Sequence, residues 1–153
     1  MFDSSLVHWI SYSTLYAVEC ACPVQGCPMD TSDEATILEV ARQLEGQPID
    51  LIINNAGINL PGSLETGTKE VLMRLFEVNA VGPFLVARTL LPNLQLAANT
   101  RGFAFVVSCL PSWVDSLYGY GTSKAALNMI TRSLAFDLQP KDIVCTLDML
   151  IQT

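Results

Sequence analysis

The sequence predicts an α/β fold in which a parallel sheet is covered by helices on both faces. Short apolar runs typical of buried strands, such as 103–107, alternate with longer stretches whose apolar residues recur at helical spacing. The chain has 153 residues, 50% of them hydrophobic, which is enough to bury one core. A single domain is therefore expected.

The first part of the chain is expected to supply a helix between two strands. Residues 24–29 predict a short strand, and 49–53 predict a buried one. Thr31 and Glu34 have the spacing of a capping box at the start of the helix between them. The apolar face of this helix is predicted to consist of Ile37, Leu38, Ala41 and Leu44.

The second part of the chain continues the alternation. A helical stretch covers 69–94, and Pro83 is expected to bend or restart it. Strands are predicted at 103–107 and 143–147, on either side of a helix at 120–138. One side of that last helix carries Ala126, Leu127, Ile130 and Leu134.

Charge and apolar patterning exclude several classes of partner. Eight basic against fifteen acidic residues give a net charge of −7, which repels phosphate backbones, so no nucleic-acid partner is expected. The longest apolar candidate for a membrane span, 6–18, is shorter than the roughly 20 residues that a helix needs. No Lys or Arg precedes Arg42, so a secretory signal with a basic start is not expected either. We expect a soluble cytoplasmic protein that does not bind membranes.

The cysteines predict neither a disulfide framework nor a metal site. Their odd number, without a secretion signal, favours reduced thiols. A zinc site usually takes four ligands, and the cluster near the start offers three, with His8 as a distant fourth. The five cysteines are Cys20, Cys22, Cys27, Cys109 and Cys145.

Three segments fall where the strands of such a sheet end: the turn 54–57, Ser108 with Cys109, and the start of the helix at Tyr120. Ligands bind beyond the carboxyl ends of parallel strands, so these segments are expected to meet at a site. Tyr120 and Lys124 are four residues apart and share one face of a helix.

An ammonium close to a phenol favours the phenolate, which lowers the pKa of Tyr120 below its usual value of about 10. Such a tyrosine can exchange a proton with a carbonyl or carbinol oxygen near neutral pH. Taken alone, the spacing also fits a solvated Tyr–Lys pair on a helix surface. With a single His8 far from these residues, a Ser-His-Asp hydrolase is not expected.

Four motifs resemble the short-chain dehydrogenase/reductase family, and within it the carbonyl-reductase-like members that carry Tyr-x-Tyr-x-x-Ser-Lys. They occur in the family's order and at about its spacing, and the resemblance covers roughly 28–147. It implies a Rossmann-like parallel sheet with helices on both faces. The motifs are Met29–Asp33, Asn54-Asn55-Ala56-Gly57, Val78–Gly82 and Tyr118–Asn128.

The resemblance implies a role for each catalytic position. Tyr120 would be the general acid in reduction and the base in oxidation. Lys124 would hold the cofactor ribose and lower the pKa of Tyr120, and Asn79 would anchor a water that passes protons to Lys124. Asn79 could instead cap or kink its helix.

The resemblance also implies a cofactor, NADP(H) or NAD(H), without indicating which. Asp30 would face the adenine, and Asn55, Ala56 and Gly57 would line the cofactor channel with their backbone. Asn54 would tie neighbouring strands together. In the simpler alternatives, Asp30 begins the next helix and Gly57 supplies a turn.

The catalytic serine of the family has two candidates in this chain. The family places it as the second residue of a Ser-Ser pair after the strand 103–107, where the sequence reads Ser108-Cys109. Position in the motif favours Cys109, whereas the distance to Tyr120 fits Ser108 about as well. We assign Ser108, because a thiol is the weaker hydrogen-bond donor; Ser112 is a distant third.

Both ends depart from the family pattern. The first fifty residues contain only Gly26 and Gly46, so the glycine-rich unit that cradles a pyrophosphate is missing, as is the substrate-covering C-terminal segment. We therefore divide the chain into a divergent segment, 1–27, and a partial Rossmann-like domain, 28–153. Residues 6–18 are a hypothetical replacement for the lost central strand.

The expected function is NAD(P)-dependent oxidoreduction, with hydride transfer to or from a small carbonyl compound or secondary alcohol. The alternative is a catalytically silent, truncated relative that acts through dimerisation. Apolar helix faces at 84–94 and 126–134 resemble the family's dimer-forming helices. A homo-oligomer, or a dimer with a full-length relative, is therefore expected.

Overall fold

A computed structural model of the chain describes residues 17–18, 27–111 and 118–150. Its centre is a parallel sheet with the strand order β3 (Leu51–Asn54), β4 (Ala104–Pro111) and β5 (Ile143–Leu150). A separate antiparallel pair consists of β1 (Ala17–Val18) and β2 (Cys27–Pro28). The predicted Rossmann-like parallel sheet is confirmed.

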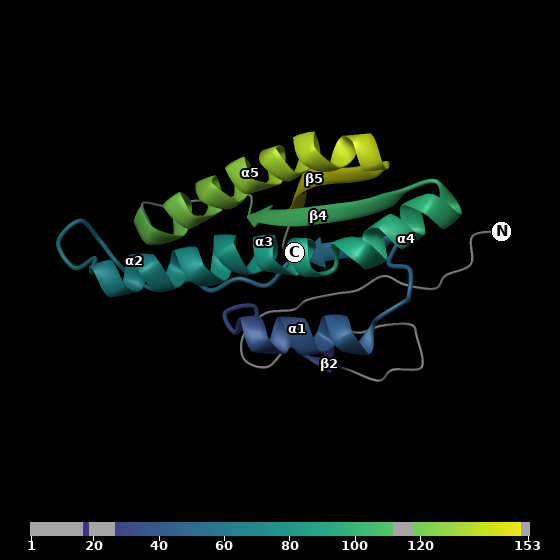
Figure 1. The fold of residues 1–153 in the computed structure, drawn as a ribbon. Helices are drawn as coiled ribbons and strands as arrows, with labels where there is room; N and C mark the ends of the chain where they lie inside the picture. Colours follow the sequence, from purple (N-terminus) through teal and green to yellow (C-terminus); the bar gives the residue numbers. More distant parts are fainter. Residues whose placement is uncertain (1–16, 19–26, 112–117, 151–153) are drawn as a thin grey trace.

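In Figure 1, α2, α3 and α4 follow one another end to end, with α5 beside β5 on one side of this row and α1 on the other side. A π-helical turn, η1, separates α2 from α3, and a 3₁₀ turn, η2, follows α5. The segments are α1 (Glu34–Gln43), α2 (Lys69–Phe76), η1 (Glu77–Val81), α3 (Gly82–Thr89), α4 (Leu91–Arg101), α5 (Tyr118–Leu138) and η2 (Gln139–Lys141).

Within these ranges the helices pack against one face of the sheet. Successive side chains of a strand point to opposite faces, and the register aligns Ile52 with Val106 and Ala104 with Ile143 on the same face. These four side chains are buried in one core with residues of α1, α3, α4 and α5. On the other face, Phe105 is 36% exposed and Val144, its register partner, is 49% exposed.

The start of α1 corrects two expectations. Its N-cap is Asp33, whose carboxylate accepts the N–H of Ala35 at 3.0 Å, and not Thr31 of the predicted capping box. Thr31 is instead buried. On the predicted apolar face, Leu38 is 53% exposed, and Val40 is buried in its place. Ile37 and Leu44 of the predicted face are buried, and Ala41 packs against the same core.

The long helical stretch restarts at Pro83, as predicted. Proline has no N–H to donate to the carbonyl of Asn79, four residues back, and its ring crowds that carbonyl. The helix widens there into η1, in which the N–H of Gly82 donates to the carbonyl of Glu77, five residues back. A second interruption, at Leu90, separates α3 from α4.

Most of the segment 6–18, with the hypothetical replacement strand, lies outside the described residues. Its last two residues form β1, which pairs with β2 and not with β3. The alternative metal cluster also falls largely outside them, while Cys145 carries a free thiol. In the part that the structure covers, no helix is long and apolar enough to cross a membrane, and no acidic, cysteine and histidine side chains group as a metal site.

Close packing at Gly82 generates the first prediction. A methyl group at this position would lie 2.7 Å from the carbonyl oxygen of Thr31 and 2.8 Å from its Cβ, so backbone would have to move. We expect Gly82→Ala to lower the free energy of unfolding by about 2 kcal/mol in a urea titration. Gly62→Ala, whose methyl group would make only ordinary contacts, is the control; equal stability of the two variants would contradict the packing argument.

Candidate active site

Buried polar side chains gather where the loop after β3 meets η1 and the first turns of α5. Asn79 comes from η1, and Tyr120, Ser123 and Lys124 come from α5. All four are buried; Lys124, an ammonium group, is only 7% exposed. Because a charge is costly to bury without polar surroundings, this cluster is the candidate active site.

The Asn79 carboxamide holds the cluster together. Its Oδ1 accepts the backbone N–H of Ile58 at 2.8 Å, and its Nδ2 donates to the carbonyl of Ile58 at 2.9 Å. The same Nδ2 donates to Oγ of Ser123 at 3.0 Å. One buried side chain thus joins the loop after β3, the π turn and α5.

Tyr120 and Lys124 lie on one face of α5, as their spacing predicts. Nζ of Lys124 is 5.8 Å from the centre of the Tyr120 ring. The Lys124 ammonium thus lies over the ring of Tyr120, the phenol whose ionisation it is expected to favour.

The loop after β3 also lies close to Lys124. Asn55 donates its N–H to the carbonyl of Ile53 at 3.1 Å, and Ala56 is buried. A methyl group on Gly57 would lie 3.1 Å from Oδ1 of Asn79 and 3.4 Å from Nζ of Lys124. The structure therefore brings the predicted loop residues together with Asn79 and Lys124.

Ser108 is not brought to Tyr120. Its hydroxyl is buried and accepts a hydrogen bond from Oγ1 of Thr131 at 3.2 Å. Thr131 lies eleven residues beyond Tyr120 on α5, which is about 16 Å along a helix. The side chain of Cys109 and all of Ser112 lie outside the described residues.

Asp30 lies in the loop before α1, and its side chain bonds within that loop. Its Oδ1 accepts the hydroxyl of Ser32 at 2.7 Å and the N–H of Ser32 at 2.9 Å. These two bonds, helped by the positive charge of Arg74, hold the pKa of Asp30 below its ordinary value. The carboxylate is exposed and ionised at neutral pH.

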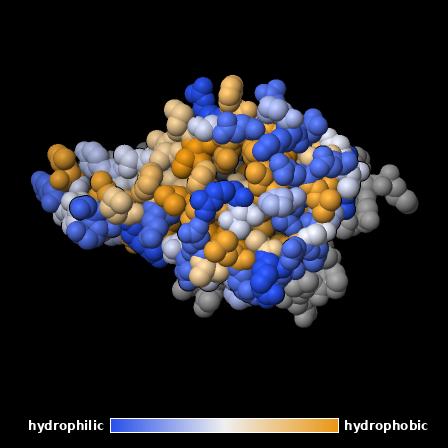
Figure 2. Space-filling model, viewed as in Figure 1, coloured by the Kyte–Doolittle hydropathy of each residue, from blue (hydrophilic) through white to orange (hydrophobic). Residues whose placement is uncertain are grey.

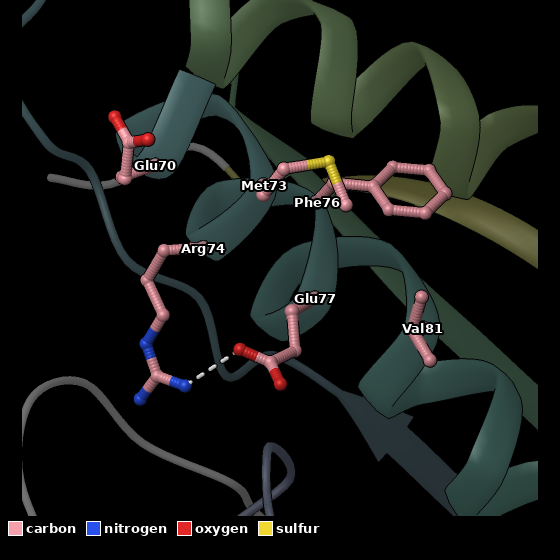
Figure 3. A pocket seen from close by; sticks show the side chains of 6 residues that line it. All are labelled: Glu70, Met73, Arg74, Phe76, Glu77 and Val81. Atoms are coloured by element: carbon pink, nitrogen blue, oxygen red, sulfur yellow. Dashed lines mark hydrogen bonds and ion pairs between the residues drawn. The ribbon is translucent and has the colours of Figure 1, made fainter. Parts of the chain in front are cut away.

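A surface pocket on α2 and η1 lies apart from this cluster (Figure 3). Arg74 and Glu77 form an ion pair of 2.8 Å on one side of it, while Met73 and Phe76 lie together on the other. None of the four side chains of the candidate site lines it. The lining residues are Glu70, Met73, Arg74, Phe76, Glu77 and Val81.

Comparison with known proteins identifies the family. The sequence profile described as short chain dehydrogenase matches residues 16–147, a range that reaches into the segment 1–27. The chain belongs to the short-chain dehydrogenase family.

Two curated proteins are similar to a little under two thirds of this chain. The protein named C-signal, of Myxococcus xanthus, is 39% identical over 105 residues, which cover 65% of this chain and 63% of that protein. Carbonyl reductase (NADPH) 2 of Sus scrofa is 34% identical over 98 residues, which cover 63% of this chain and 40% of that protein.

Among solved structures, the NADPH-bound carbonyl reductase from chicken fatty liver superposes with a TM-score of 0.72 at 27% identity. The superposition covers 79% of this chain and 55% of that one. This chain therefore spans about half the length of that carbonyl reductase. It spans less than two thirds of the length of each of the two curated relatives.

Sequence reasoning missed the site's third polar residue of α5, Ser123. It precedes Lys124 inside the motif that signalled the family, so its position was a usable signal. Its partner Asn79 lies 44 residues away on another element, and single-sequence spacing does not reveal such a pair.

The buried carboxamide gives the second prediction. Asn79→Ala removes three hydrogen bonds and leaves the N–H and carbonyl of Ile58 without that partner, so we expect the free energy of unfolding to fall by about 3 kcal/mol. Chemical denaturation measures it. Asn128→Ala, an exposed position on α5, is the control and should change stability by less than about 0.5 kcal/mol. A similarly small change for Asn79→Ala would contradict the assigned network.

Proposed function

We propose that the chain is an NAD(P)-dependent oxidoreductase that reduces a small carbonyl compound or oxidises a secondary alcohol. The observation that carries the proposal is the buried Tyr120–Lys124 pair beside Asn79 and Gly57. Membership of the short-chain dehydrogenase family supports it. The NADPH named with the similar chicken carbonyl reductase supports NADP(H) as the cofactor to test first.

Tyr120 is the proposed proton donor to a carbonyl oxygen and, in the reverse direction, the acceptor of the carbinol proton. The Lys124 ammonium, 5.8 Å from the ring centre, favours the phenolate that remains after donation. Asn79 is proposed to anchor a water that returns a proton by way of Lys124.

The residues present fit one end of a dinucleotide. Lys124 would hold the ribose next to the nicotinamide, and the backbone of Asn55, Ala56 and Gly57 would line the channel. At Gly57, the lack of a side chain lets the backbone approach Lys124 closely. When bound, the nicotinamide supplies or accepts the hydride. Asp30 is proposed to lie on the adenine side.

The donor to the developing oxyanion is proposed to come from position 108 or 109. The hydrogen bond with Thr131 counts against Ser108, because it engages the buried hydroxyl eleven residues beyond Tyr120 on α5. Removing one such donor typically costs a hundredfold or more in rate. A chain with Cys109 at this position would reduce carbonyls slowly.

We also propose a cytoplasmic location and self-association. On α5, Tyr118, Met129 and Phe136 recur at helical spacing and are exposed, Phe136 by 81%. On the face drawn in Figure 2, apolar side chains reach the surface among the polar ones. A second copy, or a full-length relative, would cover this stripe.

A catalytically silent relative is the second candidate. Neither the described residues nor the first fifty positions of the sequence contain a glycine-rich phosphate loop, and the exposed stripe on α5 favours association. In this case the chain acts through its partner.

The third prediction separates these two functions. With NADPH and a panel of aldehydes, ketones and quinones, Tyr120→Phe should lower turnover at least roughly a hundredfold, because the phenolic proton is lost. Tyr118→Phe, an exposed tyrosine two residues away, should retain full turnover. Equal turnover of the Tyr120→Phe variant and the parent would refute the assignment. Absence of turnover in a folded parent chain would favour the silent relative.

A further inference from the structure

The hydroxyl of Ser123 connects two parts of the candidate site. It donates to the backbone carbonyl of Tyr120 at 2.7 Å and accepts the N–H of Asn79 Nδ2 at 3.0 Å. The residue after it is Lys124. Ser123 thus lies within the helical turn that carries both ionisable groups, and bonds to the residue that fixes the loop after β3.

We infer that Ser123 is a positioning residue, whose hydroxyl fixes the orientation of the Asn79 carboxamide and thereby the distance of the loop after β3 from Tyr120 and Lys124. The inference rests on the proposed function, because positioning matters for catalysis only if Tyr120 and Lys124 act on a substrate.

The direction of the hydrogen bonds carries the argument. A backbone carbonyl can only accept, so Ser123 must donate its single proton to Tyr120. Its oxygen is then free to accept only, which selects the amide nitrogen of Asn79 and not the oxygen. The same orientation is required at Ile58, whose N–H donates to the Asn79 oxygen. A flipped carboxamide would set two acceptors against each other at Ser123 and two donors at Ile58.

Burial raises the cost of the flipped orientation of the Asn79 carboxamide. Asn79 and Ser123 are both almost completely buried, so water cannot readily substitute for a lost partner. Ile58 follows Gly57, whose backbone approaches Lys124. A carboxamide that loses its orientation therefore releases the loop beside the proposed cofactor channel.

The same helix offers a serine without this second contact. Ser133 donates to the carbonyl of Met129 at 3.1 Å, a local bond that serines commonly make in helices. It is exposed, and this hydrogen bond stays within α5. Ser133→Ala therefore removes a hydroxyl from α5 while leaving the Asn79 network intact.

The test compares Ser123→Ala with Ser133→Ala and with Ser123→Thr, which keeps the hydroxyl. The first readout is amide hydrogen exchange at Ile58 by NMR, referred to the amide of Val106 in the core to remove any global loss of stability. It needs neither cofactor nor turnover. The second is the division of the NADPH-dependent activity into kcat and KM.

We expect Ile58 exchange to accelerate roughly tenfold relative to Val106 in Ser123→Ala, to stay unchanged in Ser133→Ala, and to return toward the parent rate in Ser123→Thr. The kcat should fall by a similar factor, with KM for the carbonyl compound unchanged. If Ser123→Ala does not fold, Ser123→Cys replaces it, since a thiol is a weak donor and acceptor.

Unchanged Ile58 exchange in folded Ser123→Ala would overturn the inference, as would equal acceleration in Ser133→Ala. If the parent chain shows no turnover while Ile58 exchange responds as expected, the proposed function fails and the positioning of Asn79 stands. If exchange responds but kcat does not, the hydroxyl orders the loop without serving catalysis, and the positioning role is rejected.

Discussion

The buried carboxamide of Asn79 is the interaction on which the rest of the site depends. It bonds both backbone groups of Ile58 and the hydroxyl of Ser123, so that the loop after β3, the π turn and α5 are held together through one side chain. In a buried setting each of these bonds is costly to leave unmade. Lys124 and Tyr120 take their places relative to Gly57 because the elements that carry them are joined at Asn79.

Pro83 and Gly82 explain why Asn79 is in this position. Proline cannot complete the α-helical bond to the Asn79 carbonyl, and the backbone opens into a π turn at that residue. Gly82 lets α3 approach the loop at Thr31 closely. The proline therefore sets the geometry of the helix at η1. In this geometry the side chain of Asn79 is buried.

The alternation of apolar strands and helices was sufficient to predict the parallel sheet, and the spacing of Tyr120 and Lys124 predicted their shared face. Contacts between segments far apart in the sequence cannot be predicted from such spacing. The N-cap at Asp33, the burial of Thr31 and the pairing of Ser108 with Thr131 depend on neighbours far along the chain. Periodicity also gives no indication that the described helices share one face of the sheet.

The central proposal is that the buried Lys124, next to Tyr120, would hold the ribose of NAD(P)(H). Calorimetric titration of the purified chain with NADPH, and then with NADH, tests it most directly, with Lys124→Met as the comparison. The account predicts binding in the micromolar range and a thermal midpoint that rises with cofactor concentration, both strongly reduced in Lys124→Met. Absence of binding at millimolar cofactor, or equal binding by Lys124→Met, would contradict it.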